Sequence, residues 1–269
     1  MRKTLAAGSA AALATSGLLF AAAPASAADA TVSVLHAIPA GAGADVVDVY
    51  ANGNLLIDNF TPGTLKTVTV PAGTYLLQVS ADGQPASAAI LTLNQEVPAG
   101  ANATVAAYLT ADAKPAIKTF INSTKMSASG QGTLTVRHIA AAPVVDILAN
   151  GAKVAALSPL ANGEEKLADL PAATYSAAVA LTGTTAPAIG PADVPVKAGT
   201  TTIVYAWGSA DLGGFKVATQ DVQQMPAGVP AGEAGLADNG GFPAWALGLM
   251  AAGALGAVVA TRRLAADRG

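Results

Sequence analysis

Cysteine is absent from this chain of 269 residues, which also has only two histidines and few aromatic side chains. Without cysteine, no disulfide stabilises the fold, and neither a thiol nucleophile nor a cysteine-based metal site can form. Each folded domain must therefore be held together by its apolar core, which requires a domain of reasonable size. A zinc site needs three or four protein ligands, and a chain with only two histidines and no cysteine has few residues that could supply them.

Positive charge is scarce as well. The segment from Ala28 to Gly241 contains nine Lys or Arg residues against sixteen Asp or Glu residues, so its side-chain charge is −7. It has no cluster of basic residues, and nucleic acid and anionic lipid are therefore not expected as partners. The sequence contains no P-loop, dinucleotide-binding fingerprint or EF-hand loop, so it predicts no cofactor and no bound metal.

Both ends of the chain are apolar. Residues 1–27 have a short basic start, an Ala- and Leu-rich run and small residues at the end, which is the order of a secretory signal peptide cleaved after Ala27. Residues 242–261 carry no charge and are followed by two arginines. A helix of that length spans about 30 Å, the thickness of a bilayer core. We therefore expect one C-terminal transmembrane helix, with residues 262–269 as a cytoplasmic tail.

The stretch before this helix suggests a second kind of anchor. Residues 223–241 are rich in Pro, Gly and Ala, so we expect a flexible stalk. Within it, "LADNG" at 236–240 resembles a Gram-positive cell-wall sorting signal, with candidate cleavage between Asn239 and Gly240. Ala237 and Asn239 stand where such pentapeptides usually carry Pro and Thr. The sequence thus predicts an extracytoplasmic protein of a Gram-positive bacterium, anchored in the membrane or to the cell wall.

The middle of the chain contains one pattern twice. The octet "VVDVYANG" at residues 46–53 returns as "VVDILANG" at residues 144–151, a separation of 98 residues. Three further motifs return at similar separations, so the period has the size of a domain and exceeds that of a solenoid repeat. We therefore predict two duplicated domains, residues 30–122 and 133–222, joined by the polar linker 123–132.

Each copy has the pattern of an all-β domain. Short β-rich runs alternate with turn signals every 8 to 12 residues or so, and no long amphipathic helix fits residues 30–222. Asn52-Gly53 and Asn150-Gly151 indicate type I′ hairpin turns, in which both central residues need a positive φ. Pro71-Ala72-Gly73 indicates a further turn. The predicted fold is all-β, with two tandem β-sandwich domains of immunoglobulin-like type.

The few candidates for chemistry stand at equivalent places in the two copies. His36 and His138 lie near the end of the first predicted strand, and Asp48 and Asp146 follow within the repeated octet. A His and an Asp on neighbouring strands could face each other across a hairpin, as a catalytic dyad or half of a metal site. A Ser-His-Asp enzyme also needs a placed nucleophile and oxyanion donors, and the chain has no Gly-x-Ser-x-Gly motif.

A structural role accounts for the same residues. Strand alternation places Asp48 on the face of Val46 and Tyr50, where a buried carboxylate needs a partner such as a histidine or a turn N–H group. Tyr75 and Tyr175 could stack on a ligand, but tyrosines after such turns more often serve the core or a corner of the fold. The two histidines and two aspartates are therefore weak binding candidates, and no catalytic residue or metal ligand is assigned.

These motifs together resemble a bacterial family of domains of unknown function, the one numbered 4397. Its members show a strand ending in His-Ala, a Pro-containing loop, a Val-Asp-Val-Tyr hairpin and a later Pro-Ala-Gly-Thr-Tyr turn. The first copy carries them at Leu35-His36-Ala37, Pro39, Val47 to Tyr50, Asn52-Gly53 and Pro71 to Tyr75. The second copy departs at Ile147-Leu148 and Ala173. The resemblance implies an extracytoplasmic β-sandwich module, often repeated and surface-anchored, with no activity firmly assigned.

Three functions are compatible with this sequence. The first is a non-enzymatic surface protein whose modules serve adhesion, ligand binding or cell-envelope interaction, with peptidoglycan, a glycan or another surface protein as partner. The second is a structural spacer without a specific ligand, and the third is an extracellular hydrolase that uses the His/Asp pairs. Low charge, the lack of a cofactor motif and the duplication favour the first, so we predict a protein that is not an enzyme.

Overall fold

The computed structural model describes residues 27–226, and in this part every regular element except two short 3-10 helices is a β-strand. This confirms the all-β prediction. Several predicted segments lie outside the described residues. They are the signal peptide up to its last residue, the stalk beyond residue 226, the candidate cleavage residues Asn239 and Gly240, the transmembrane segment and the tail. Among the described helices, none has the length and apolar character needed to cross a membrane.

The first copy folds as two four-stranded sheets that pack on each other. One sheet has the order β4-β1-β7-β8 and the other β3-β2-β5-β6. The strands of the first sheet are β1 (Ala30–Ala37), β4 (Leu65–Val70), β7 (Asn102–Leu109) and β8 (Pro115–Ile121). Those of the second are β2 (Val47–Ala51), β3 (Asn54–Phe60), β5 (Gly73–Ala81) and β6 (Leu91–Val97), with the 3-10 helix η1 (Ala86–Ala88) between β5 and β6. Aliphatic side chains from both sheets form the core of this first sandwich.

The second copy repeats this plan with the sheet orders β12-β9-β15-β16 and β11-β10-β13-β14. The first of these sheets contains β9 (Gln131–Ala141), β12 (Glu164–Pro171), β15 (Thr200–Ser209) and β16 (Gly214–Gln223). The other contains β10 (Val145–Ala149), β11 (Ala152–Lys153), β13 (Ala173–Leu181) and β14 (Pro187–Val196), with the 3-10 helix η2 (Ala155–Leu157) after β11. The main difference from the first sandwich is that β11 is much shorter than its counterpart β3.

Local signals in the sequence explain the hairpins. Asn52 and Gly53 have φ of 52° and 78°, and Asn150 and Gly151 have φ of 52° and 79°, as a type I′ turn requires. These turns connect β2 to β3 and β10 to β11, which confirms both hairpin predictions. Gly73 has no positive φ, in keeping with the alanine at the equivalent position 173.

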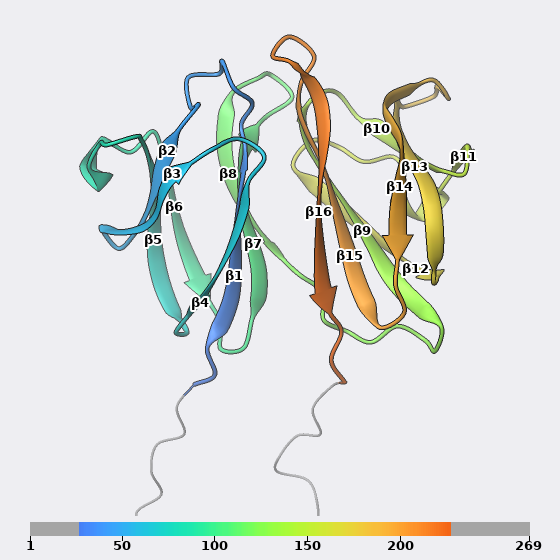
Figure 1. Cartoon of the computed structure of the whole chain (residues 1–269), viewed down its shortest axis with the longest axis horizontal. Coiled ribbons are helices and arrows are strands. Elements are labelled where there is room, and N and C mark those ends of the chain that lie inside the picture. Colours follow the sequence, from blue (N-terminus) through green and yellow to red (C-terminus); the bar gives the residue numbers. More distant parts are fainter. Residues whose placement is uncertain (1–26, 227–269) are drawn as a thin grey trace, which may run out of the picture. The chain divides into compact units, whose positions relative to one another are not determined.

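The two sandwiches contact each other through one sheet each. We call β4-β1-β7-β8 and β12-β9-β15-β16 the facing sheets, and the other two the outer sheets. Both sandwiches lie in one compact unit that ends at Gln224, and Figure 1 shows the four sheets standing side by side with the facing sheets in the middle. A cluster of buried apolar side chains from both facing sheets fills the space between them.

The central strands of the facing sheets are buried on both sides for this reason. β1 pairs in parallel with β7, and β9 pairs in parallel with β15, while the other pairings are antiparallel. Strands covered on both faces are almost continuously buried, as β7 and β15 are. The strand order also differs from the immunoglobulin constant-type pattern of seven antiparallel strands, so the prediction holds at the level of an all-β tandem sandwich.

Candidate functional site

Both histidines are buried and bound to the backbone of the loop that follows their own strand. His36 on β1 places Nε2 2.8 Å from the carbonyl oxygen of Ala44, and His138 on β9 places Nε2 2.9 Å from that of Pro143. A carbonyl oxygen can only accept, so Nε2 carries the proton in each ring. Each residue is 1% exposed, and this burial lowers the pKa of both imidazoles.

The two aspartates also bind backbone groups. Asp48 accepts hydrogen bonds from the N–H groups of Asn59 (3.1 Å) and Gly83 (2.9 Å), one on each carboxylate oxygen. Asp146 accepts one from Gly183 (3.1 Å) through Oδ2, and its Oδ1 lies 2.9 Å from Nζ of Lys153. The Lys153 ammonium, followed by the Gly183 N–H, lowers the pKa of Asp146. The Asp48 carboxylate thereby connects β3 to the turn that follows β5, and the Asp146 carboxylate connects β11 to the turn that follows β13.

The histidine and aspartate of one copy do not form a pair. His36 lies on β1 of the facing sheet, whereas Asp48 lies on β2 of the outer sheet. The hypothesis that they face each other across a hairpin is wrong, because β1 pairs with β4 and β7 while β2 pairs with β3 and β5. The same separation holds for His138 on β9 and Asp146 on β10.

Three carboxylates, that of Asp48 among them, lie close together in the first sandwich. Asp48, Asp58 and Asp82 each offer an oxygen, and these oxygens lie within 4.8 Å of one another. Carboxylate oxygens in such a group are the ligand type that Ca²⁺ and Mg²⁺ prefer. The second sandwich keeps only the first of these carboxylates, as Asp146, which contacts the ammonium of Lys153. Asp58 and Asp82 stand outside the repeated motifs, so no sequence signal marks them as members of this group.

The largest polar network lies between the facing sheets. The guanidinium of Arg137 donates from Nε to Glu165, from Nη1 to the hydroxyl of Tyr205 and from Nη2 to Oδ1 of Asn122, each at 2.8 Å. Its centre also lies 4.6 Å from the ring centroid of Phe120. Arg137 is fully buried, and Asn122 and Phe120 belong to the first sandwich, so this side chain connects the two copies.

The network continues beyond Tyr205. Its hydroxyl lies 2.6 Å from Oε1 of Gln220 and 3.1 Å from Oγ1 of Thr104, and Gln220 donates from Nε2 to Oγ of Ser33 at 2.9 Å. Burial raises the pKa of the Tyr205 phenol, while the Arg137 charge opposes that rise. Polar groups buried together are stable only when they satisfy one another, as they do here.

Sequence reasoning missed this interface, although one signal for it was present. Arg137 stands in β9 where the first copy has Leu35 in β1, and Tyr205 stands in β15 where the first copy has Ala106 in β7. A charged residue and a phenol that replace apolar residues inside buried strands indicate a face that contacts something polar. The two copies have therefore diverged at the positions where they meet.

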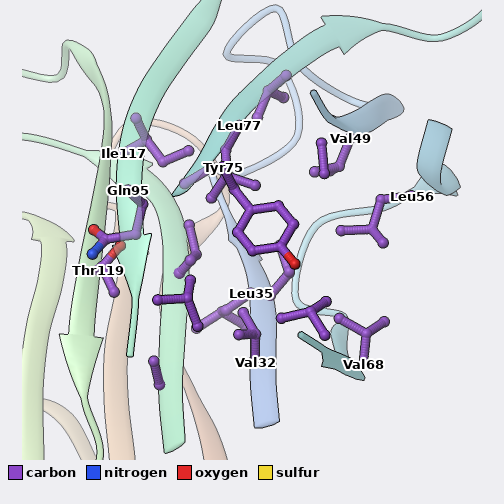
Figure 2. A pocket seen from close by; sticks show the side chains of 18 of the residues that line it. Val32, Leu35, Val49, Leu56, Val68, Tyr75, Leu77, Gln95, Ile117 and Thr119 are labelled. Carbon is purple, nitrogen blue, oxygen red and sulfur yellow. The ribbon is translucent and has the colours of Figure 1, made fainter. Parts of the chain in front are cut away.

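Tyr75 and Tyr175 take the local structural role that the sequence favoured. Their hydroxyls donate to the carbonyl oxygens of Pro71 (2.8 Å) and Pro171 (2.9 Å), four residues earlier in each copy. The ring of Tyr75 also lines a cavity of about 40 Å³ inside the first sandwich. Figure 2 shows this ring among aliphatic side chains, with Gln95 and Thr119 to one side.

The fold and these contacts define a tandem β-sandwich protein whose two copies share a buried interface. Residues 30–148 match the family described as a domain of unknown function, DUF4397. This match covers the first sandwich and the second as far as β10, and it supports the resemblance that the motifs suggested. No curated protein matches the chain.

Proposed function

We propose that this chain is an exported, non-enzymatic protein of the cell envelope, whose two sandwiches act together as one interaction module. In this proposal, the apolar C-terminal sequence or the sorting-like segment holds the module at the cell surface of a Gram-positive bacterium. The module binds peptidoglycan, a glycan or a surface protein.

One observation supports the non-enzymatic role above all. The four residues with the best chemistry for catalysis, His36, His138, Asp48 and Asp146, are each at most 3% exposed and bind groups of the chain itself. A general base must reach the proton that it removes. These side chains instead hold loops and hairpins in place.

The interface between the sandwiches supports a single rigid module. The facing sheets are covered, so any partner meets the outer sheets and the loops at the ends of the sandwiches. Loops held on a rigid scaffold are common binding elements in β-sandwich proteins. The same rigidity favours a second candidate, a structural spacer, and binding experiments separate the two.

Cell fractionation tests the location. Cells that make the full chain are compared with cells that make a chain ending at Gln224. We expect the full chain in the envelope fraction, accessible to protease added outside the cell, and the shortened chain in the medium. A full chain that stays in the cytoplasm would contradict the proposal.

Cosedimentation tests the interaction. The full chain is mixed with isolated cell walls and with purified peptidoglycan, and saturable retention supports an interaction module. Surface location without retention on walls, peptidoglycan or intact cells would favour the spacer. Release of soluble wall fragments, abolished in the variant D48N, would favour the hydrolase and contradict the proposal.

A further inference from the structure

Three carboxylates of the first sandwich lie close together with no positive charge paired to them. Asp48 lies on β2, Asp58 on β3 and Asp82 in the turn after β5, and one oxygen of each lies within 4.8 Å of the other two. Among the described residues, no Lys or Arg forms an ion pair with any of the three. Like charges this close repel one another, and a cation between them would remove that repulsion.

The three carboxylates have acceptor positions left for a cation. Asp48 is buried, and its two oxygens accept backbone N–H groups from Asn59 and Gly83, which fixes the carboxylate in place. A carboxylate offers about four acceptor positions, so Asp48 keeps two of them. Asp58 and Asp82 are exposed, so their side chains can adjust around an ion that the buried carboxylate holds.

The second sandwich has a cation at the equivalent place. Nζ of Lys153 lies 2.9 Å from Oδ1 of Asp146, the counterpart of Asp48 in the repeated octet. Lys153 is itself the counterpart of Leu55, because each is the second residue after its Asn-Gly turn and pairs across the hairpin in the same register. An ammonium group of the chain thus binds this carboxylate in the second copy. This contact is independent of the acidic group, and it shows that the place accepts a positive charge.

The two additional carboxylates are missing where the lysine is present. Gly83 and Gly183 donate to the two aspartates in the same way, so Asp82 corresponds to Thr182. Asp58 has no acidic counterpart either, because residues 154–163, which follow β11, contain no Asp or Glu. One copy therefore combines three carboxylates with a leucine, and the other combines one carboxylate with a lysine. This joint difference is expected if a free cation in the first copy takes the place of the ammonium in the second.

We infer that Asp48, Asp58 and Asp82 bind a calcium ion, at the place that the Lys153 ammonium takes in the second sandwich. Calcium takes about six to eight oxygen ligands in flexible geometry, so carboxylates from three separate segments and water can complete its shell, whereas magnesium demands a nearly ideal octahedron. Three protein residues correspond to the affinity of extracellular calcium modules, with a Kd of about 10⁻⁴ to 10⁻³ M. The site departs from the expectation of no bound metal, which rested on the absence of known metal-binding motifs. It also goes beyond the proposed function, which does not require it.

Calcium titration of the full chain tests the site. Calorimetry should show saturable calcium binding with a Kd of about 0.1–1 mM, and magnesium should bind at least about tenfold more weakly. Asp82→Asn keeps the shape of an exposed side chain and removes its charge, so it should weaken calcium binding at least about tenfold. Asp112→Asn is the matched control, because it removes the same charge from an exposed turn outside the group and should bind calcium like wild type. Absence of saturable calcium binding, equal affinity for magnesium, or equal calcium affinity in wild type and Asp82→Asn would overturn the inference.

Leu55→Lys tests the equivalence of the two copies. It gives the first sandwich the lysine of the second, and the new ammonium should compete with calcium for Asp48 and weaken calcium binding at least about tenfold. Ile121→Lys adds the same charge at another exposed apolar position, on β8 of the facing sheet, and should leave calcium binding unchanged. Unchanged calcium affinity in the folded Leu55→Lys variant, with folding checked by circular dichroism, would contradict the equivalence on which the inference rests. If this variant does not fold, Asp82→Asn decides the matter.

Thermal unfolding gives a second readout. Calcium at about 10 mM should raise the melting temperature of wild type by about 3 °C or more, because the ion binds the folded chain only, and the rise should be absent in Asp82→Asn. An equal rise in both would refute the site. Envelope location and retention on cell walls are measured without added calcium. If calcium fails to bind while both persist, this inference fails and the proposed function stands.

Discussion

Replacing Arg137 by leucine tests whether the buried network holds the two sandwiches together. Leucine is the residue at the equivalent position 35, so the change copies the first repeat into the second. Removing one partner of a fully buried ion pair costs about 3–5 kcal/mol. Here Glu165 keeps a third of its side chain exposed and can be hydrated, and Asn122 retains a hydrogen bond from Thr104. We therefore expect a loss of about 2–3 kcal/mol, which corresponds to a fall in melting temperature of about 4–12 °C.

Thermal unfolding of the full chain followed by circular dichroism measures this loss. The near-ultraviolet signal should change as well, because Trp207 and Tyr205 are buried between the facing sheets. Lys197→Leu is the matched control, since it removes an ion pair with Asp221 whose side chains are 60% and 36% exposed. Exposed pairs contribute at most about 1 kcal/mol. If Arg137→Leu costs no more than this control, the network does not stabilise the interface and the reasoning is refuted.

Two further predictions concern the histidines and one glycine. Burial keeps His36 and His138 neutral in the folded chain, whereas in the unfolded chain they take up protons near their ordinary pKa of 6.5. Their contribution to stability is therefore complete above about pH 6.5 and is lost as the pH falls through the lowered folded pKa. Urea unfolding at a series of pH values should show that the free energy of unfolding of the wild type falls with falling pH below about 6.5, and that it falls less steeply in the double variant His36→Ala/His138→Ala. The double variant should also lose about 2–4 kcal/mol of stability. An equally steep pH dependence in the double variant would contradict the conclusion that these two histidines cause it. Gly132→Ala should cost about 1–3 kcal/mol, because its Cβ would lie 2.1 Å from the carbonyl oxygen of Lys197. At Gly73 the φ is ordinary and an added Cβ would only make a van der Waals contact with the Tyr75 ring at 3.9 Å, so the melting temperature of Gly73→Ala should match that of wild type. Equal losses in the two glycine variants would argue against the steric explanation.

The strands and hairpins were predictable because their signals are local. Asn52-Gly53 and Asn150-Gly151 specify their turns within two residues, and alternation of apolar residues specifies the strands between them. The repeat added the conclusion that both copies share one fold. Each of these inferences needed only neighbouring residues and no knowledge of which strands pair.

The contacts between distant strands were not predictable in the same way. His36 and Asp48 follow each other closely in the sequence, but their strands β1 and β2 belong to opposite sheets of the sandwich. The partner of Arg137 at the interface, Asn122, comes from the other copy, where no repeated motif marks it. The acidic group around Asp48 likewise combines residues from three separate strand ends.

The shared interface has a consequence for how this architecture can grow. In a string of independent domains, copies can be added one after another, because each presents the same surfaces as the last. Here each sandwich has one facing sheet, and its partner already covers that sheet. A third copy would find no free facing sheet, and a single copy would expose the apolar face that includes Leu35 and Phe120. If this architecture is extended by duplication, we therefore expect copies to be added in pairs, because only a pair buries both facing sheets.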